Sequence, residues 1–438
     1  MRALEDALPP EALGDAAEAP GLAASVDALI RPGNPAEVSE ALAWARGEGT
    51  TIVPVGTGRH VPRVVAPVRC AVLSTERMSG VTIYEPADLT LTALAGTPLS
   101  ALRDELAPHA QWLPFDPPDV EARTLGGLVA SGLSGPLATG YGALRNHVLG
   151  ATVVLGDGRR LRLGGRVVKN VAGFDLLRPV VGSLGGLCVV TEICVRLFPE
   201  PKVDRLLISR ADTPSALVGA ARAVARAPVI PASCVLVSGA DGSGGGAALL
   251  VRLHGARRTV DADQRTFERA IGRPVEVVDE EVAVVARAAR DHPVRSGGDA
   301  GAAGGTVAGA GQELGIGVAS APADRLGNLL SALDSALGRV PFSCDAYSGR
   351  VRFGLDAGRV PALATLRRAV EALGGSLGVE RAPGGGAPDL GDAVSTPSAG
   401  EAKLAARVRA VFDPTGIFWP SADQPAIAGD AARPGAIR

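Results

Sequence analysis

The sequence predicts an α+β protein of more than one domain. Its 438 residues suffice for roughly two or three domains, each with its own core. Up to about residue 202, short apolar runs typical of strands are joined by glycine-bearing turns. From Val203 onward, helical patterns alternate with short strand patterns, which is typical of a second α+β domain.

The composition indicates a soluble globular protein. Hydrophobic residues make up 46% and charged residues 21% of the chain, and the net charge of -2 offers no basic field for nucleic acid or a membrane surface. The five cysteines are scattered without CxxC spacing, which argues against an iron–sulfur or metal site and fits a reducing cytoplasm. Residues 126–144 are uncharged, but six glycines and Pro136 make them too weakly apolar for a membrane helix. The acidic N-terminus has no signal-peptide pattern.

The first elements can be predicted from their caps and turns. Residues 1–24 are expected to be a tail. A helix begins after Asn34, where Asn stands at the N-cap, Pro35 at the first position and Glu37 at the third, and it ends near Gly49. A buried strand over 50–55 runs into Gly56-Thr57-Gly58. Such a turn can direct successive N–H groups toward a phosphate, although most are only tight turns.

A second helix start lies in the glycine-rich stretch 124–197. Thr124 is the expected N-cap of a short helix, one face of which carries Gly127, Ala130 and Ser131. Small side chains at this spacing let the helix lie flush against a neighbour. That neighbour is either another backbone or a dinucleotide whose pyrophosphate meets the helix N-terminus. Residues 148–155 and 159–163 are expected to form a hairpin and 187–197 a strand, and the domain boundary is placed near Lys202.

The second domain is expected to alternate helices and strands. The predicted helices cover 215–227, 261–272, 323–337 and 361–373, and the predicted strands cover 205–209, 233–237, 247–254 and 350–354. Glycine-rich stretches at 241–246 and 296–311, and the stretch 383–398, are expected to be loops. A final helix over 401–412 precedes Asp413-Pro414.

Several ordered motifs together resemble a known flavoprotein family. They are Ile30-Arg31-Pro32, Gly56-Thr57-Gly58, Asp88-Leu89-Thr90, Ala95-Gly96-Thr97-Pro98-Leu99, Asp116-Pro117-Pro118, the stretch 124–135, Tyr141-Gly142, Lys169-Asn170-Val171-Ala172-Gly173-Phe174-Asp175-Leu176 and the stretch 182–192. As a set they resemble the FAD-binding domain of the vanillyl-alcohol oxidase / p-cresol methylhydroxylase (PCMH) superfamily. The run 169–176 is most similar to the FAD-binding subunit of bacterial glycolate oxidase.

The resemblance implies a fold, a cofactor and a site. The fold would be a PCMH-type FAD-binding domain of two α+β subdomains over 25–202 and an α+β cap domain over 203–400. A C-terminal helix and Asp-Pro motif over 401–421 would return to the flavin domain, with 422–438 as a disordered tail. FAD would lie between the two N-terminal subdomains. The residues expected to bind it are Gly56, Thr57, Gly58, Arg59, Pro117, Thr124, Gly126, Gly127, Ala130, Gly132, Tyr141, Gly142, Lys169, Gly186, Val189 and Thr191.

The resemblance also implies a function and partners. The chain would be the FAD-binding oxidoreductase subunit of a glycolate-oxidase-like complex that oxidises a small 2-hydroxy acid. Its partners would be a homologous flavoprotein subunit and an iron–sulfur subunit, with no nucleic acid and no transmembrane segment. It would be cytoplasmic, either free or peripheral at the inner membrane through the complex. The sequence identifies no catalytic base.

Two departures from the family pattern keep an alternative open. The family's pyrophosphate loop usually has three consecutive glycines, which Val55 and Thr57 interrupt here, and Trp419-Pro420-Ser421 replaces the C-terminal Asn-Pro-Gly. The alternative is a non-catalytic assembly subunit with weak or no flavin binding. In the cap, His254 and His292 lack a metal-binding pattern, so no metal is expected.

His60 raises the question of a covalent flavin link, because some members of the superfamily attach the flavin to a histidine near their glycine loop. The glycine turn should, however, face the pyrophosphate, far from the flavin ring. The glycolate oxidase subunits that the chain resembles are not expected to carry such a link. FAD is therefore expected to be held non-covalently.

Overall fold

The chain forms two compact units. The computed structural model describes residues 4–19, 26–58, 70–165, 175–238, 246–295, 314–381, 395 and 397–419, with the backbone alone at 292–295 and 381. Unit 1 comprises Met1–Ser134, Ala143–Glu200 and Thr396–Arg438, and unit 2 comprises Gly135–Gly142 and Pro201–Ser395. The chain thus leaves unit 1 after Glu200, and residues 135–142, expected in the flavin domain, group with unit 2.

Unit 1 contains a small, mainly parallel sheet with the strand order β1-β2-β4-β3. Its strands are β1 (Leu13–Gly14), β2 (Val26–Ile30), β3 (Thr51–Val55) and β4 (Cys70–Ser74). Helix α2 (Pro35–Glu48) begins as predicted, because the Asn34 side chain accepts hydrogen bonds from the amides of Ala36 and Glu37. Gly49 ends the helix in the left-handed region at φ 65°.

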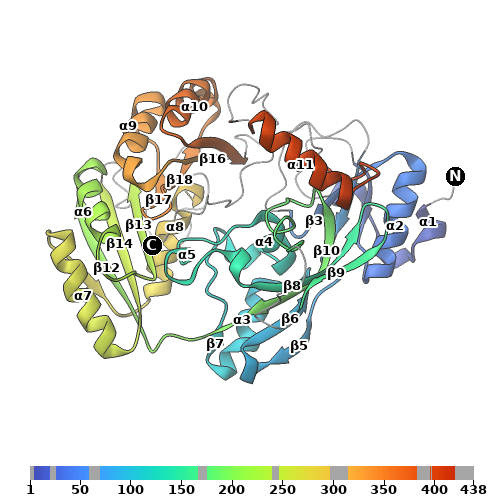
Figure 1. The fold of residues 1–438 in the computed structure, drawn as a ribbon, viewed down its shortest axis with the longest axis horizontal. Helices are drawn as coiled ribbons and strands as arrows, with labels where there is room; N and C mark the ends of the chain where they lie inside the picture. The colour runs from blue at the N-terminus through green and yellow to red at the C-terminus, as the bar shows by residue number, and fades with distance from the viewer. Residues whose placement is uncertain are drawn as a thin grey trace. The chain divides into compact units, whose positions relative to one another are not determined.

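A second sheet of unit 1 is antiparallel, with the strand order β5-β6-β10-β8-β9 (Figure 1). Its strands are β5 (Val81–Glu85), β6 (Thr90–Leu94), β8 (Val148–Leu155), β9 (Arg160–Gly164) and β10 (Cys188–Arg196). The predicted hairpin and the predicted strand are therefore confirmed. Helices α3 (Leu99–Leu106) and α4 (Leu125–Ser131) pack on this sheet through a shared apolar core. A short pair, β7 (Gln111–Trp112) and β11 (Phe198–Pro199), completes the unit.

The N-terminal residues belong to the core of unit 1 and are not the tail that the sequence predicted. Helix α1 (Leu4–Ala7) contacts α2, and β1 pairs with β2. Leu8 and Ala12 are 4% and 0% exposed and pack with Ile30 and Leu42. This apolar burial orders a segment whose own pattern is too short to predict.

The C-terminal segment is anchored in unit 1 by a buried carboxylate. Helix α11 (Ala399–Phe412) starts with a capping box between Ser398 and Glu401. Beyond it, Asp413 accepts hydrogen bonds from the amides of Ile417 (3.0 Å) and Phe418 (2.9 Å). Ile417 and Trp419 then bond to the backbone of Ile52 in β3.

Unit 2 is built on one antiparallel eight-stranded sheet with the order β15-β12-β14-β13-β17-β18-β16-β19. Its strands are β12 (Val203–Ala211), β13 (Ser233–Ser238), β14 (Ala247–Gly255), β15 (Glu276–Val278), β16 (Gly315–Ser320), β17 (Phe342–Asp345), β18 (Arg350–Leu355) and β19 (Ser376–Arg381). Its helices are α6 (Ser215–Ala225), α7 (Arg257–Ile271), α8 (Val282–Arg295), α9 (Leu326–Leu337) and α10 (Leu363–Ala372), together with the one-turn α5 (Ala138–Tyr141).

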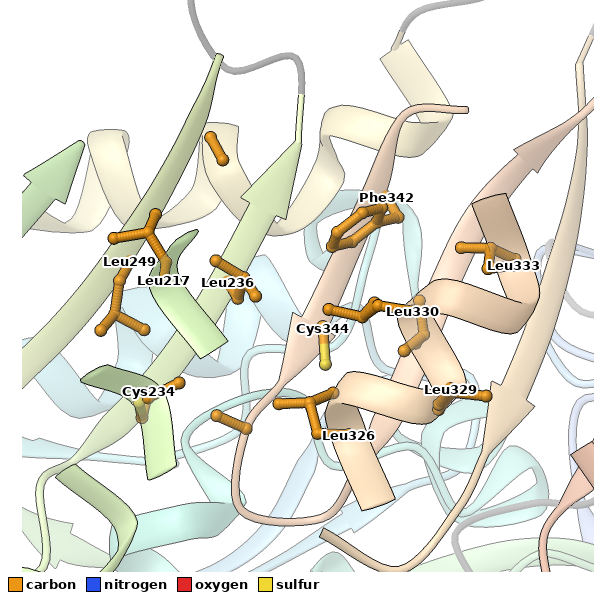
Figure 2. Packing of buried hydrophobic residues seen from close by; sticks show 14 of the residues in the cluster. Leu217, Cys234, Leu236, Leu249, Leu326, Leu329, Leu330, Leu333, Phe342 and Cys344 are labelled. Atoms are coloured by element: carbon orange, nitrogen blue, oxygen red, sulfur yellow. The ribbon is translucent and has the colours of Figure 1, made fainter. Parts of the chain in front are cut away.

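Helices cover both faces of this sheet. The main core lies between the sheet and α6, α7, α9 and α10; Figure 2 shows Leu236, Cys344 and Leu330 within it. Helix α8 packs on the opposite face, against Leu206, Val235 and Leu250. The alternation of core residues, such as Leu206 on one side and Leu207 on the other, follows from the two-residue period of a strand. The α+β class predicted from the sequence is confirmed.

Candidate cofactor pocket

Unit 1 contains a cavity with about 710 Å³ of empty space, open solvent at its mouth included. Three segments form most of its lining: the end of β3 with its turn, α4 with the two residues before it, and the turn into β10 with the first residues of that strand. The lining residues are Pro54, Val55, Gly56, Thr57, Gly58, Thr75, Arg123, Thr124, Gly126, Gly127, Ala130, Ser131, Ser183, Leu184, Gly185, Cys188, Val189 and Val190.

The turn after β3 needs glycine at the two positions that have it. A Cβ at Gly56 would lie 2.3 Å from Thr124 Oγ1, and Gly58 has a φ of 71°. Position 57 lies outside the left-handed region and does not require glycine; the Thr57 hydroxyl donates to the Ala122 carbonyl at 2.6 Å. Among the described residues, no acceptor lies within hydrogen-bond reach of the Thr57 and Gly58 amides. The threonine that interrupts the glycine run therefore leaves both demanding positions intact.

The N-terminus of α4 is capped as predicted, but its amides are already bonded. The Thr124 side chain accepts from the Gly127 amide at 3.1 Å. The Leu125 and Gly126 amides donate to the carbonyls of Thr97 (2.9 Å) and Ala95 (2.7 Å), and the Leu128 amide donates to the Thr124 carbonyl. The sequence left two neighbours open for this helix, another backbone or a dinucleotide. In the structure, the backbone that follows β6 accepts the hydrogen bonds of the first two amides of α4.

The three glycines of the α4 region have different structural roles. A Cβ at Gly126 would lie 2.7 Å from Ala95 Cβ, so this glycine lets the helix pack on β6. A Cβ at Gly127 would meet only Thr124 Oγ1, at 3.1 Å, so a side chain there would extend into the cavity. Gly132 ends the helix at φ 66°, and its Cβ position lies 3.0 Å from Gly182 Cα.

The turn into β10 forms the third wall. Leu184 has a φ of 55°, which is strained for a side chain of this kind, and its amide donates to the Ala130 carbonyl of α4 at 2.8 Å. Gly185, at φ 80°, lets the turn approach Pro54. Burial raises the pKa of Cys188 to about 12, so this thiol is neutral and unsuited to act as a nucleophile.

Eight of the predicted residues line the cavity: Gly56, Thr57, Gly58, Thr124, Gly126, Gly127, Ala130 and Val189. Pro117, Gly132, Gly186 and Thr191 belong to unit 1 but do not line it. Thr191 is fully buried and donates to the Thr152 carbonyl, while the Gly186 carbonyl accepts from Arg409. Arg59, His60 and Lys169 lie outside the described residues.

The sequence reading missed Arg123 as a pocket residue. Arg123 is only 5% exposed, and among the described residues that line the cavity it alone has an ionised side chain. Its position between a Pro-rich segment and a helix cap gave no periodic signal. The signal that could have revealed it is its place next to the N-cap of a glycine-rich helix.

Tyr141 and Gly142 were predicted to bind the cofactor, but the structure groups them with unit 2. The Tyr141 hydroxyl is 2.8 Å from His254 Nδ1, and His254 Nε2 is 3.1 Å from Asp204 Oδ1. Arg252 donates to both oxygens of Asp204. Burial raises the pKa of Tyr141 to about 12, and burial lowers the pKa of His254. A neutral His254 can therefore accept from Tyr141 and donate to Asp204.

The described residues contain no metal-binding cluster and no helix that could cross a membrane. Within this part of the chain, no three His, Cys, Asp or Glu side chains group closely enough to hold a metal ion. Of the helices that the structure describes, none combines the length and apolar character that a membrane crossing needs.

Known proteins share the fold and part of the sequence. Alkyldihydroxyacetonephosphate synthase superimposes with a TM-score of 0.67 over 90% of this chain and 76% of its own, at 15% identity, which is a likeness of fold. Residues 26–164 match the model of a family described as "FAD binding domain". This range includes two of the three pocket walls, so most of the pocket lies within the matched FAD binding domain.

Curated relatives make the family more specific. Glycolate oxidase subunit GlcE of Escherichia coli (strain K12) is 43% identical over 148 residues, which are 34% of this chain and 40% of that protein. D-lactate dehydrogenase of Archaeoglobus fulgidus is 36% identical over 39% of each chain. Glycolate oxidase subunit GlcD of Bacillus subtilis (strain 168) is 31% identical over 47% of this chain and 44% of that protein.

The chain carries a PCMH-type FAD-binding domain and is related to glycolate oxidase subunits and D-lactate dehydrogenases, which confirms the family resemblance and the expected cofactor, FAD. The matched segments cover only about two fifths of the length of these relatives.

Proposed function

We propose that this chain is the FAD-binding subunit of an oxidoreductase complex that acts on a 2-hydroxy acid, and that the cavity of unit 1 holds the cofactor non-covalently. The observation that carries the proposal is the coincidence of that cavity with the FAD binding domain match. The relatives named for glycolate and D-lactate share the 2-hydroxy acid group as substrate class.

The residues present fit a dinucleotide in two respects. Gly127 leaves room that a side chain would fill, so the backbone can approach a flat or anionic ligand closely there. The remaining wall is formed by neutral, mostly small side chains around one cation, Arg123. A bound flavin would accept two electrons from the substrate, and the chain's own residues would position it and exclude water from it.

Of the two departures that kept open the alternative of an assembly subunit with weak or no flavin binding, the interrupted glycine run was the one that favoured it. With Gly56 and Gly58 in place, that interruption no longer argues for it. The predicted partners, a homologous flavoprotein subunit and an iron–sulfur subunit, remain part of the proposal, as do glycolate as the substrate and a peripheral membrane location.

The test is a flavin titration of the full chain and of Gly127→Trp. The indole would occupy the cavity, so we expect the variant to fold and to lose measurable FAD affinity while the wild type binds one FAD per chain. Gly219→Trp is the matched control, because Gly219 lies exposed on α6 of unit 2 with nothing within 4 Å of its Cβ position. If Gly127→Trp keeps stoichiometric FAD, the cofactor does not lie in this cavity.

A further inference from the structure

Helix α7 of unit 2 carries a row of arginines on the side that faces solvent. Its residues Phe267 and Ile271 are buried in the main core of the unit, so the opposite side is exposed. Arg258, Arg265 and Arg269 lie on that opposite side and are all exposed. Their spacing of seven and four residues places them in one line along about 16 Å of helix. These three residues are here called the arginine stripe.

The arginine stripe has no ion-pair partner in the part of the chain that the structure describes. Arg205 on the nearby strand β12, by contrast, is paired with both Asp261 and Asp279. Glu268, which precedes the last arginine of the stripe, accepts a hydrogen bond from Gln264 at 2.7 Å. The positive charge of the stripe is therefore left to solvent or to a binding partner.

The stripe also weakens the helix that carries it. Arg265 and Arg269 are four residues apart, and like charges at this spacing repel each other on a helix. The first turn of α7 contains Arg257 and Arg258 and no acidic residue, although the positive end of the helix dipole favours an acid there. An anion bound along the stripe would relieve both effects. Local rules that are broken without a gain inside the fold are typical of functional surfaces.

The form of the stripe favours a narrow acidic partner over a flat anionic one. Three charges in one line match an acidic segment laid along α7, and each guanidinium can donate two parallel hydrogen bonds to one carboxylate. Anionic membranes are usually bound by clusters of roughly four to eight basic residues, more than the stripe offers. The open hollow beside Arg265 and Arg269 is lined by Ala262, Thr266 and Glu268, so it offers no large apolar side chain to insert into a bilayer.

We propose that the arginine stripe is a docking surface for an acidic segment of a partner subunit. The inference rests on one part of the proposed function, the assembly of the chain into a complex, and not on the flavin site. Because exposed ion pairs are screened by salt, the stripe would set the rate and the orientation of association more than the final affinity.

The experiment measures the binding of the full chain to labelled poly-L-glutamate by fluorescence anisotropy, at neutral pH and low salt. Because the whole chain has a net charge of -2, binding to this polyanion requires a local basic surface. Arg258→Gln/Arg265→Gln/Arg269→Gln should bind about 10- to 100-fold more weakly, since it loses three exposed ion pairs worth roughly two- to fivefold each. The affinity of the wild type should also fall more steeply with added salt than that of this variant.

A matched control removes the same charge from other exposed positions of unit 2. Arg222→Gln/Arg226→Gln/Arg368→Gln should change the affinity for poly-L-glutamate less than about threefold, because these arginines do not share one face of a helix. Both triple variants should bind FAD as the wild type does. Vesicles of phosphatidylserine and phosphatidylcholine test the flat alternative, and the wild type should bind them no better than the stripe variant does.

Equal losses in the two triple variants, or a wild type that does not bind poly-L-glutamate at low salt, would overturn the inference. Vesicle binding that depends on the stripe, without stripe-dependent binding of poly-L-glutamate, would overturn it in favour of a membrane surface. A wild type that binds FAD but not poly-L-glutamate leaves the flavin site standing. A wild type that binds poly-L-glutamate through the stripe but takes up no FAD would overturn the proposed flavin site and leave the docking surface standing.

Discussion

Gly56→Ala should disrupt the pocket through one identified contact. The new Cβ would lie 2.3 Å from Thr124 Oγ1, against about 3.4 Å for ordinary contact, while Thr124 Cβ and Cγ2 remain at 3.5 Å. Relieving the overlap displaces the N-cap of α4, whose loss costs about 1 kcal/mol. The remaining overpacking adds about 1–2 kcal/mol. We therefore expect Gly56→Ala to lower the free energy of unfolding of unit 1 by about 2–3 kcal/mol.

Removal of the threonine hydroxyl should rescue this variant. Thr124→Ala alone should cost about 1 kcal/mol, and Gly56→Ala/Thr124→Ala should cost no more, because the new methyl then has room. Urea unfolding followed by tryptophan fluorescence suits the measurement, since all three tryptophans, Trp44, Trp112 and Trp419, belong to unit 1. Gly47→Ala in α2, with nothing within 4 Å of its Cβ position, is the control and should be neutral or stabilising. Strictly additive costs in the double variant would refute the proposed contact.

Three further predictions concern other parts of the chain. Glu380→Gln should destabilise unit 2 by about 3 kcal/mol in thermal unfolding, because Glu380 is a buried acceptor for both Arg350 (3.2 Å) and Arg352 (2.7 Å). As a control, Glu371→Gln removes an exposed carboxylate from its pair with the half-buried Arg367 and should cost under about 1 kcal/mol. Burial alone would raise the pKa of Asp204, but hydrogen bonds from Arg252 and His254 lower it to about 2. The ionised Asp204 should therefore add about 2 kcal/mol to the free energy of unfolding above pH ~4, and this contribution should be lost as the pH falls toward 2. Acid titration by circular dichroism should show this loss in the wild type and a flatter curve in Asp204→Asn. Lys169→Ala should change flavin affinity, activity or complex assembly, and no effect on all three would remove Lys169 from the site.

Local signals in the sequence were reliable guides to the fold. The caps at Asn34 and Thr124 depend on side chains within three residues of the amides that they bond, so they can be predicted without the rest of the chain. Helix α8 was not predicted, although Val282, Val285 and Ala289 recur at helical spacing and pack on the sheet.

Contacts between distant residues could not be predicted in the same way. Thr124, which lies 68 residues later in the chain, leaves no room for a Cβ at Gly56, and Ala95 leaves none at Gly126. The Tyr141 hydroxyl forms its hydrogen bond with His254. Each glycine reads from the sequence as a ligand contact, and the structure shows that Gly56 and Gly126 also serve backbone packing. The family motif therefore located the cavity, and long-range packing decided which of its residues face it.

The flavin content of the purified wild-type chain tests the central claim most directly. The visible absorbance spectrum should show one FAD per chain, either as purified or after addition of FAD, and acid precipitation should release all of the yellow colour into the supernatant. A chain that neither retains nor takes up FAD would contradict the account. A fluorescent band that survives denaturing electrophoresis, and is lost in His60→Ala, would contradict non-covalent attachment.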